Sequence, residues 1–289
     1  MSAVFKKEFR SGMCGMTGMI FIAYVLLFLG LYTVYVNYYL QMGNFEIVVI
    51  SAAFLSLLAV PLLTMRSFSE ERHNKTDQLL YSLPISTGKI VLGKFFGMAA
   101  IFAVPTAILC IYPLIAGIYS SGSINYAIGY GSILAYYLLG CAVIAICMFL
   151  STLTESQVIA AILSIGVILL LYFSDLLLTV VPSGPVVSLI AAIILALILA
   201  AVVFAGTKNG VAGSVCGGVL IIGIIIAYVI DASLFDGLLQ TIIGALSIFT
   251  PIESFGLGTF DVACLFRYLS ICALFIFFTA QSFEKRRWN

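Results

Sequence analysis

The sequence predicts an all-α integral membrane protein, a bundle of helices that cross a lipid bilayer. Three observations support this fold class: 63% of the 289 residues are hydrophobic, 9% are charged, and the mean hydropathy is +1.22. Soluble domains carry roughly 25% charged residues. A chain this apolar needs lipid around it, and we expect residues 1–289 to form a single transmembrane domain.

Apolar segments long enough to cross a bilayer recur along the chain. A transmembrane helix needs about 20 mostly apolar residues. On that criterion we expect about eight spans, at Met19–Tyr39, Ile47–Met65, Phe95–Ile118, Ala127–Leu150, Val158–Leu178, Val186–Phe204, Val211–Ile230 and Val262–Phe283. A bundle of six spans, without the sixth and seventh of these segments, is the alternative.

The basic residues indicate the orientation of the spans. Almost all Lys and Arg precede the first span, follow the last, or lie in the connections that an even number of spans places on the same side; Arg267 is the exception. Lys and Arg near span ends are retained in the cytoplasm. We therefore expect a multi-pass protein of the cell membrane with both termini cytoplasmic, and the six-span alternative gives the same orientation.

Residues 2–16 have the pattern of an amphipathic helix. Phe5, Phe9 and Gly12 recur at helical spacing, opposite Lys6, Lys7 and Arg10. Such a helix lies in the membrane interface with its basic side against lipid headgroups. A charged lead-in to the first span is the alternative.

Residues 237–260 are apolar but are interrupted by helix breakers, namely Pro251, Gly256 and Gly258. Irregular backbone at membrane depth is tolerated where it is buried in protein or lines a cavity. We expect a re-entrant helical hairpin that enters from the external face, with a surface loop containing an amphipathic helix as the alternative. Arg267, near the outer end of the last span, either extends to the interface or pairs with Glu253 or Asp261 and fixes this hairpin.

Glycine pairs at a spacing of four residues permit two helices to approach closely. The sequence contains Gly93/Gly97, Gly206/Gly210 and Gly213/Gly217. The spacing is common in apolar sequence and by itself does not identify an interface.

The sequence predicts no catalytic, cofactor-binding or metal-binding residues. Residues 88–94 approach the phosphate-loop pattern GxxxxGK[ST], but Phe95 occupies the position of the hydroxyl that holds Mg²⁺. His73 is the one histidine, so histidine-based metal or triad chemistry lacks partners. The net charge of +1 argues against a nucleic-acid surface.

The polar segment at residues 66–94 carries the most specific pattern in the chain. An aromatic residue precedes Glu-Glu-Arg, and a Thr, a Leu-Leu pair, Pro-Ile-Ser and Ile-Val-x-Gly-Lys follow. The residues are Phe68, Glu70, Glu71, Arg72, Thr76, Leu79, Leu80, Pro84, Ile85, Ser86, Ile90, Val91, Gly93 and Lys94. This pattern resembles the loop between the second and third spans in permeases of type-2 ABC exporters. Residues 250–258 and 283–288 resemble the gliding-motility-type branch of that family.

The resemblance implies a permease that forms half of a translocation path. Its partners would be a second permease, identical or paralogous, and a separate cytoplasmic ABC ATPase; this chain would bind no ATP itself. A short helix at 77–83, ended by Pro84, would present Leu79, Leu80 and Leu83 to a groove in that ATPase. Glu70, Glu71 and Arg72 would fix the angle of the loop by charge pairing.

Two other functions are consistent with the residues alone. Inverted repeats and charged residues in the middle of the spans would favour an ion-coupled secondary carrier. A non-transporting membrane anchor for a partner complex would depend on its loops and not on its apolar segments. Nothing in the sequence identifies a transported substrate, and the family's commonest architecture has six spans.

Overall fold

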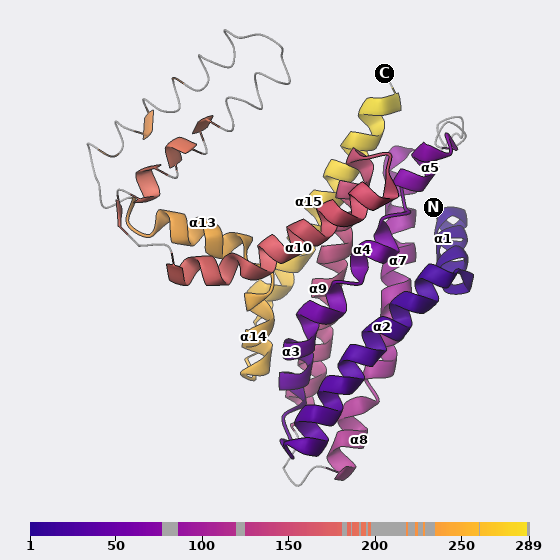
Figure 1. Ribbon diagram of the computed structural model, residues 1–289, viewed down its shortest axis with the longest axis vertical. Coiled ribbons are helices and arrows are strands. Elements are labelled where there is room, and N and C mark those ends of the chain that lie inside the picture. Colours follow the sequence, from indigo (N-terminus) through magenta and orange to yellow (C-terminus); the bar gives the residue numbers. More distant parts are fainter. Residues whose placement is uncertain are drawn as a thin grey trace. The chain divides into compact units, whose positions relative to one another are not determined.

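The computed structural model describes residues 1–76, 86–119, 125–180, 235–259 and 261–287, with single residues and short stretches between 184 and 228. The chain divides into two compact units, Met1–Leu170 with Ile248–Asn289, and Leu171–Ser247. The regular structure of the described residues is helical throughout (Figure 1). The elements are α1 (Ser2–Cys14), α2 (Met16–Thr33), the π-helix η1 (Val34–Tyr39), α3 (Phe45–Leu57), α4 (Val60–Thr64), α5 (Ser69–His73), α7 (Thr87–Leu109), α8 (Tyr112–Tyr119), α9 (Tyr126–Leu153), α10 (Gln157–Val180), α13 (Leu238–Leu246), α14 (Thr250–Gly256) and α15 (Val262–Arg287).

The predicted polytopic helical membrane fold is confirmed. In the described part of the chain, five helices are long and apolar enough to cross a membrane, and a bent pair of helices makes up to six spans. These six coincide with six of the eight predicted spans. The other two predictions, Val186–Phe204 and Val211–Ile230, lie largely outside the described residues.

The second span is broken, whereas the sequence was expected to form one continuous helix at Ile47–Met65. α3 ends at Leu57 and α4 begins at Val60 with Pro61 in its first turn, and the two segments meet at 45°. Proline is accommodated in a first turn because its missing N–H has no intrahelical partner there. Pro61 was the available signal for the break.

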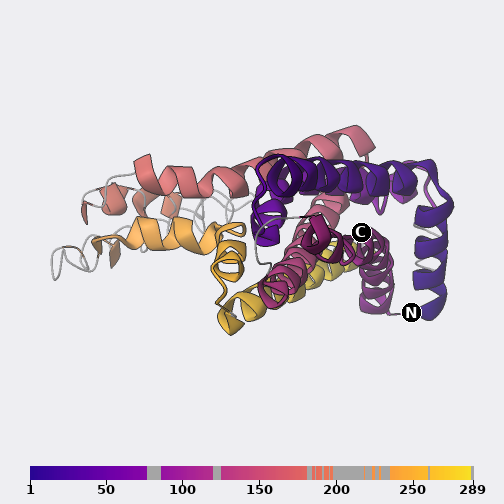
Figure 2. The ribbon, with the colours of Figure 1, turned by 90° about the horizontal axis from the view of Figure 1, so that it is seen from below.

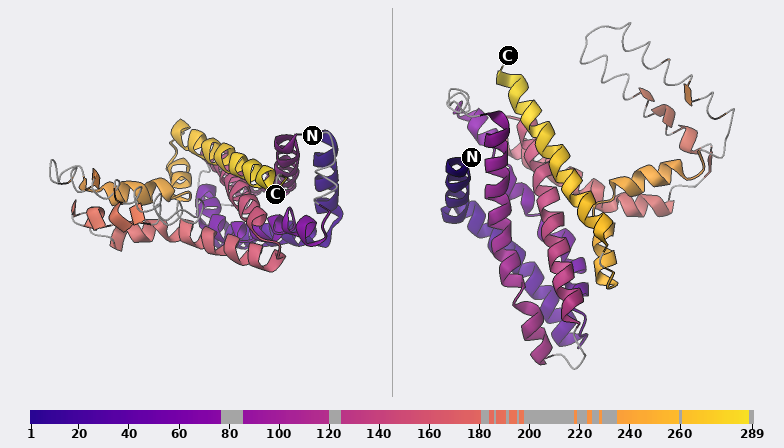
Figure 3. Two further views of the ribbon diagram at one scale, coloured as in Figure 1. Left: turned by 90° about the horizontal axis from the view of Figure 1, so that it is seen from above. Right: turned by 180° about the vertical axis from the view of Figure 1, so that it is seen from behind.

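α9 forms the centre of the larger unit. In an apolar 18-residue stretch of α9, 72% is buried inside the protein, against 22–39% in the corresponding stretches of the other four long spans. Tyr136 is fully buried on α9; its hydroxyl donates to Ser56 Oγ on α3 at 2.7 Å, and its ring lies 5.4 Å from that of Phe102 on α7. Figure 3 shows α7, α9 and α15 side by side.

α1 runs crosswise to α2 at one end of the unit (Figure 2) and packs against α7. A Cβ atom on Gly93 would lie 3.0 Å from Val4 Cβ, and one on Gly97 would lie 2.8 Å from Glu8 Cβ. The Gly93/Gly97 pair therefore forms a close helix contact of the kind that its spacing permits.

The other two glycine pairs lie at positions that the structure does not describe. α1 covers nearly all of the predicted residues 2–16, with Lys6, Lys7 and Arg10 exposed. Its location in the membrane interface stays a prediction.

The segment predicted as a re-entrant hairpin, 237–260, contains α13 and α14 with a break between them. α14 has Pro251 in its first turn and ends at Gly256, and Gly258 has a φ of +80°. Beside α14, the Phe249 ring packs edge-on against Phe54 of α3, and Tyr268 of α15 donates to Ile248 O at 3.0 Å. Pro251, Gly256 and Gly258 thus lie at the two ends of α14, and the re-entrant hairpin that enters from the external face stays a prediction.

Replacing Gly97 by Leu is expected to lower the thermal unfolding temperature in detergent. A side chain at this position would overlap Glu8 and force α1 away from α7, and overpacking costs about 1–3 kcal/mol. Gly166→Leu on α10 is the matched control, because no atom lies within 4 Å of a Cβ there. Unfolding can be followed with a thiol-reactive dye that reports the buried Cys141 and Cys147. Equal melting temperatures for the two variants would contradict the α1–α7 packing.

Candidate functional site

The described residues of the signature segment lie around α5 and at the start of α7. Phe68 precedes α5, Glu70, Glu71 and Arg72 lie on it, and Thr76 follows it. Four further predicted site residues, Leu79, Leu80, Leu83 and Pro84, lie outside the described residues, as does the signature residue Ile85. The site can therefore be built from its first half and from the start of α7.

Lys94, the last residue of the signature, is almost completely buried, with 1% of its side chain exposed. Its ammonium lies 2.8 Å from Glu71 Oε2, and it donates to Ser67 O at 2.6 Å and to Glu8 Oε1 at 3.2 Å. The ammonium is thus hydrogen-bonded to two oxygens, Glu8 Oε1 and Ser67 O, and ion-paired with a third, Glu71 Oε2. The Phe68 ring lies 4.8 Å below the same nitrogen, within cation–π range.

Glu71 joins this buried pair to the N-terminal helix. Its second oxygen, Oε1, lies 3.4 Å from Lys7 Nζ, and the Lys7 side chain is 65% exposed. An exposed pair of this kind contributes about 0–1 kcal/mol. We call Lys7, Glu8, Glu71 and Lys94 the lysine–glutamate cluster; it connects α1, α5 and α7.

The junction between α4 and α5 is held by the end of α9. The Ser151 hydroxyl accepts the N–H groups of Phe68 and Ser69 at 3.4 and 3.3 Å and donates to Met65 O at 3.3 Å. The Phe68 side chain is 1% exposed, and its ring lies 5.5 Å from that of Phe283 on α15. The bent second span is thus fixed to α9 and α15 where it ends.

α5 ends in a hydrogen-bonded turn at Lys75 and Thr76. Lys75 has a φ of +54°; its N–H donates to Arg72 O, and the N–H of Thr76 donates to Glu71 O at 2.9 Å. These two bonds form a Schellman motif. The Thr76 hydroxyl also donates to Glu71 O, at 3.2 Å.

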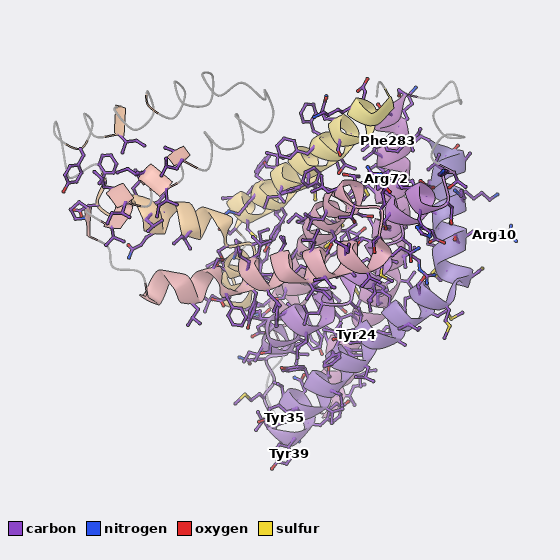
Figure 4. All side chains as sticks on the ribbon, turned by 45° about the horizontal axis from the view of Figure 1, so that its top comes forward. Arg10, Tyr24, Tyr35, Tyr39, Arg72 and Phe283 are labelled. Atoms are coloured by element: carbon purple, nitrogen blue, oxygen red, sulfur yellow. The ribbon has the colours of Figure 1, made fainter. Side chains whose placement is uncertain are left out.

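α1 and the end of α15 lie at the same end of the unit as this site (Figure 1). Thr152 of α9 donates to Ser282 Oγ on α15 at 3.1 Å. Arg72 is buried on α5, and Figure 4 shows it at the end of the molecule that carries Phe283. Tyr35 and Tyr39 lie at the opposite end (Figure 4).

The second predicted group of residues is divided between α14 and α15. Glu253 lies on α14, and Arg267 lies on α15. Asp261 immediately precedes α15, and its Oδ1 accepts the N–H of Ala263 at 2.9 Å, which caps the start of the helix. Pairing of Arg267 with Glu253 or Asp261 stays a prediction.

Sequence reasoning did not assign Lys7, Glu8 and Ser151 to the site. Lys7 was expected to face lipid, and its actual partner lies 64 residues further along the chain. Glu8 is the one acidic residue within 2–16, which is the signal that was available for it.

Comparison with known proteins identifies one family. Residues 39–184 match the family model described as ABC-2 family transporter protein. The matched range includes α5 and α7, and therefore Glu71 and Lys94. No curated protein matches the chain.

Lys94→Met is expected to reduce the free energy of unfolding by about 3 kcal/mol, because it leaves Glu71 and Glu8 without their buried partner. Glu71→Leu is expected to be destabilising for the same reason. The double substitution should cost less than the sum of the two, with a coupling energy of about 1–3 kcal/mol. Lys7→Met is the control, since its exposed pair predicts a loss below about 1 kcal/mol. Additive effects in denaturant unfolding would show that the Glu71–Lys94 pair contributes no interaction energy.

Proposed function

Because the chain belongs to the ABC-2 family of transporter proteins, we propose that it is the membrane-spanning subunit of an ATP-driven exporter, coupled to a separate cytoplasmic ABC ATPase. Membership makes the chain a membrane permease of an ABC transporter. The family match gives neither the direction of transport nor the ATPase and its docking site, and these are the parts that we propose. The lysine–glutamate cluster is the observation that carries it.

The cluster joins α5, which precedes the proposed docking segment in the sequence, to α1 and α7. Movement of residues 77–84 would reach α5 through the hydrogen-bonded turn at Lys75. From α5 it would pass to α7 through the buried Glu71–Lys94 pair and to α1 through Lys7. From the α4–α5 junction it would pass to α9 through Ser151. Closure of two ATPase subunits would in this way rearrange several spans together.

The packing of the larger unit favours a path shared with a second permease, identical or paralogous. α9 occupies the centre of that unit, and Tyr136, Phe102 and Ser56 pack there without exposure of the Tyr136 ring. A path along the surface of the unit needs another subunit to enclose it. One chain would then supply half of the path.

Two features support an orientation with the cluster at the cytoplasmic side of the cell membrane. Both chain ends and the basic residues of α1 lie near α5, as the retention of Lys and Arg in the cytoplasm requires. Tyr35 and Tyr39 have exposed, stacked rings at the other end, and tyrosine is enriched at membrane–water interfaces. Assignment to the gliding-motility-type branch is part of this proposal and rests on the resemblance of residues 250–258 and 283–288.

The double substitution Leu79→Asp/Leu80→Asp is expected to abolish co-purification of the ATPase with the detergent-solubilised protein. Two carboxylates would be placed in the apolar face that is proposed to enter a groove of the ATPase. Leu257→Asp is the control, because Leu257 is 83% exposed and lies outside the proposed docking segment. If the wild-type protein brings down no nucleotide-binding subunit, an ion-coupled carrier or a membrane anchor becomes the better assignment.

A second experiment separates docking from coupling. The double variant Lys94→Met/Glu71→Leu should still bind the ATPase, because the docking leucines are intact. In the wild-type complex, a non-hydrolysable ATP analogue should change amide hydrogen exchange at the start of α7. We expect this change to be lost in the double variant. A change of wild-type size in the double variant would show that the cluster does not transmit the movement.

A further inference from the structure

A cavity of about 330 Å³ lies between α1, the start of α2, the α4–α5 junction and α7, next to the lysine–glutamate cluster. Small-molecule sites have volumes of about 300–1,000 Å³. One water molecule occupies about 30 Å³. The cavity is therefore large enough for a chemical group of some size and exceeds the space of a single bound water.

The lining of the cavity changes from polar to apolar with depth. Arg66, Ser67 and Glu70 line it at the end of the second span, together with residues of α1. Met98 and Ile101 line it about one and two helical turns beyond Lys94, further into the third span. A lipid has the same polarity order, with a charged headgroup at one end and apolar chains beyond it.

The charges around the cavity balance. Lys7, Arg66 and the adjacent Lys94 oppose the carboxylates of Glu8, Glu70 and Glu71, so the formal charge of the six groups is zero. Three of the carboxylate–ammonium contacts are made within the lysine–glutamate cluster. Among the described residues, Arg66 and Glu70 form no ion pair with each other or with the cluster. They remain available as one donor and one acceptor of opposite charge.

Ser67 adds a polar group that lacks a partner. Its side chain is 6% exposed and lines the cavity, and its hydroxyl forms no hydrogen bond with the described residues. Buried hydroxyl groups are normally hydrogen-bonded. A phosphate oxygen in the cavity would supply an acceptor for it.

We propose that this cavity binds the headgroup of a zwitterionic phospholipid with a primary ammonium, phosphatidylethanolamine. Its phosphate accepts hydrogen bonds from Arg66 and Ser67, and its ammonium donates to Glu70. The glycerol region packs on Leu63, Met98 and Ile101. A choline headgroup has no N–H donor for Glu70, and the glycerol headgroup of phosphatidylglycerol offers Glu70 neutral hydroxyls in place of a cation. This site does not depend on an ATPase or on transport.

The test is native mass spectrometry of the delipidated protein with equal concentrations of phosphatidylethanolamine, phosphatidylcholine and phosphatidylglycerol. The wild-type protein should retain one phosphatidylethanolamine, with about tenfold preference over phosphatidylcholine, as expected for one charge-assisted hydrogen bond. Glu70→Gln should remove this preference. Arg66→Gln should reduce the binding of both phosphatidylethanolamine and phosphatidylcholine. The matched controls are Glu284→Gln and Arg10→Gln, which change exposed residues outside the cavity.

Equal retention of the three lipids by the wild-type protein would overturn the proposal, since it indicates lipid bound only around the spans. Stronger retention of phosphatidylglycerol would also overturn it in favour of a site for anionic phosphate. The comparison of headgroups on the wild-type protein needs no substitution, so the proposal can be refuted even if a variant fails to fold.

Discussion

A buried lysine ammonium sets the positions of the elements around it. The Lys94 side chain is 1% exposed, and a charge taken out of water at that depth is tolerated only if paired and hydrogen-bonded. It donates hydrogen bonds to Glu8 on α1 and to the backbone at Ser67, and it is ion-paired with Glu71 on α5. These segments are far apart in the sequence, with 86 positions between Glu8 and Lys94. The N-terminal helix, the end of the second span and the start of the third must therefore converge.

The glycine pair on α7 makes this convergence possible. Gly93 precedes Lys94 directly, and Gly97 lies about one turn beyond it on the face that α1 covers. Without a side chain at either position, the α1 backbone comes close enough for the Glu8 carboxylate to reach the Lys94 ammonium. Small residues and an ion pair thus act at the same contact, the first by permitting the approach and the second by fixing its register.

Much of this fold could be predicted from the sequence, because apolar length and the Lys/Arg distribution follow directly from the bilayer. The signature residues Glu71 and Lys94 were identified, but their pairing was not, since charge alone does not indicate which of several glutamates and lysines meet. The break at Pro61 had a signal that a hydropathy window averages away. The left-handed Lys75 had none, because glycine usually occupies that position of a Schellman turn.

The polar character of the Glu71–Lys94 contact suits a subunit that transmits movement between its helices. A buried ion pair is often no more stabilising than well-packed apolar side chains, because its desolvation cost offsets the Coulomb attraction. It differs from them in its directionality: an apolar contact permits sliding between helices, whereas two hydrogen bonds and an ion pair fix the ammonium relative to three segments. A subunit that must convey displacement from a loop to several spans needs contacts of the second kind. The neighbouring cavity lies where these same three elements meet, so a lipid headgroup bound there would contact each element that the cluster joins.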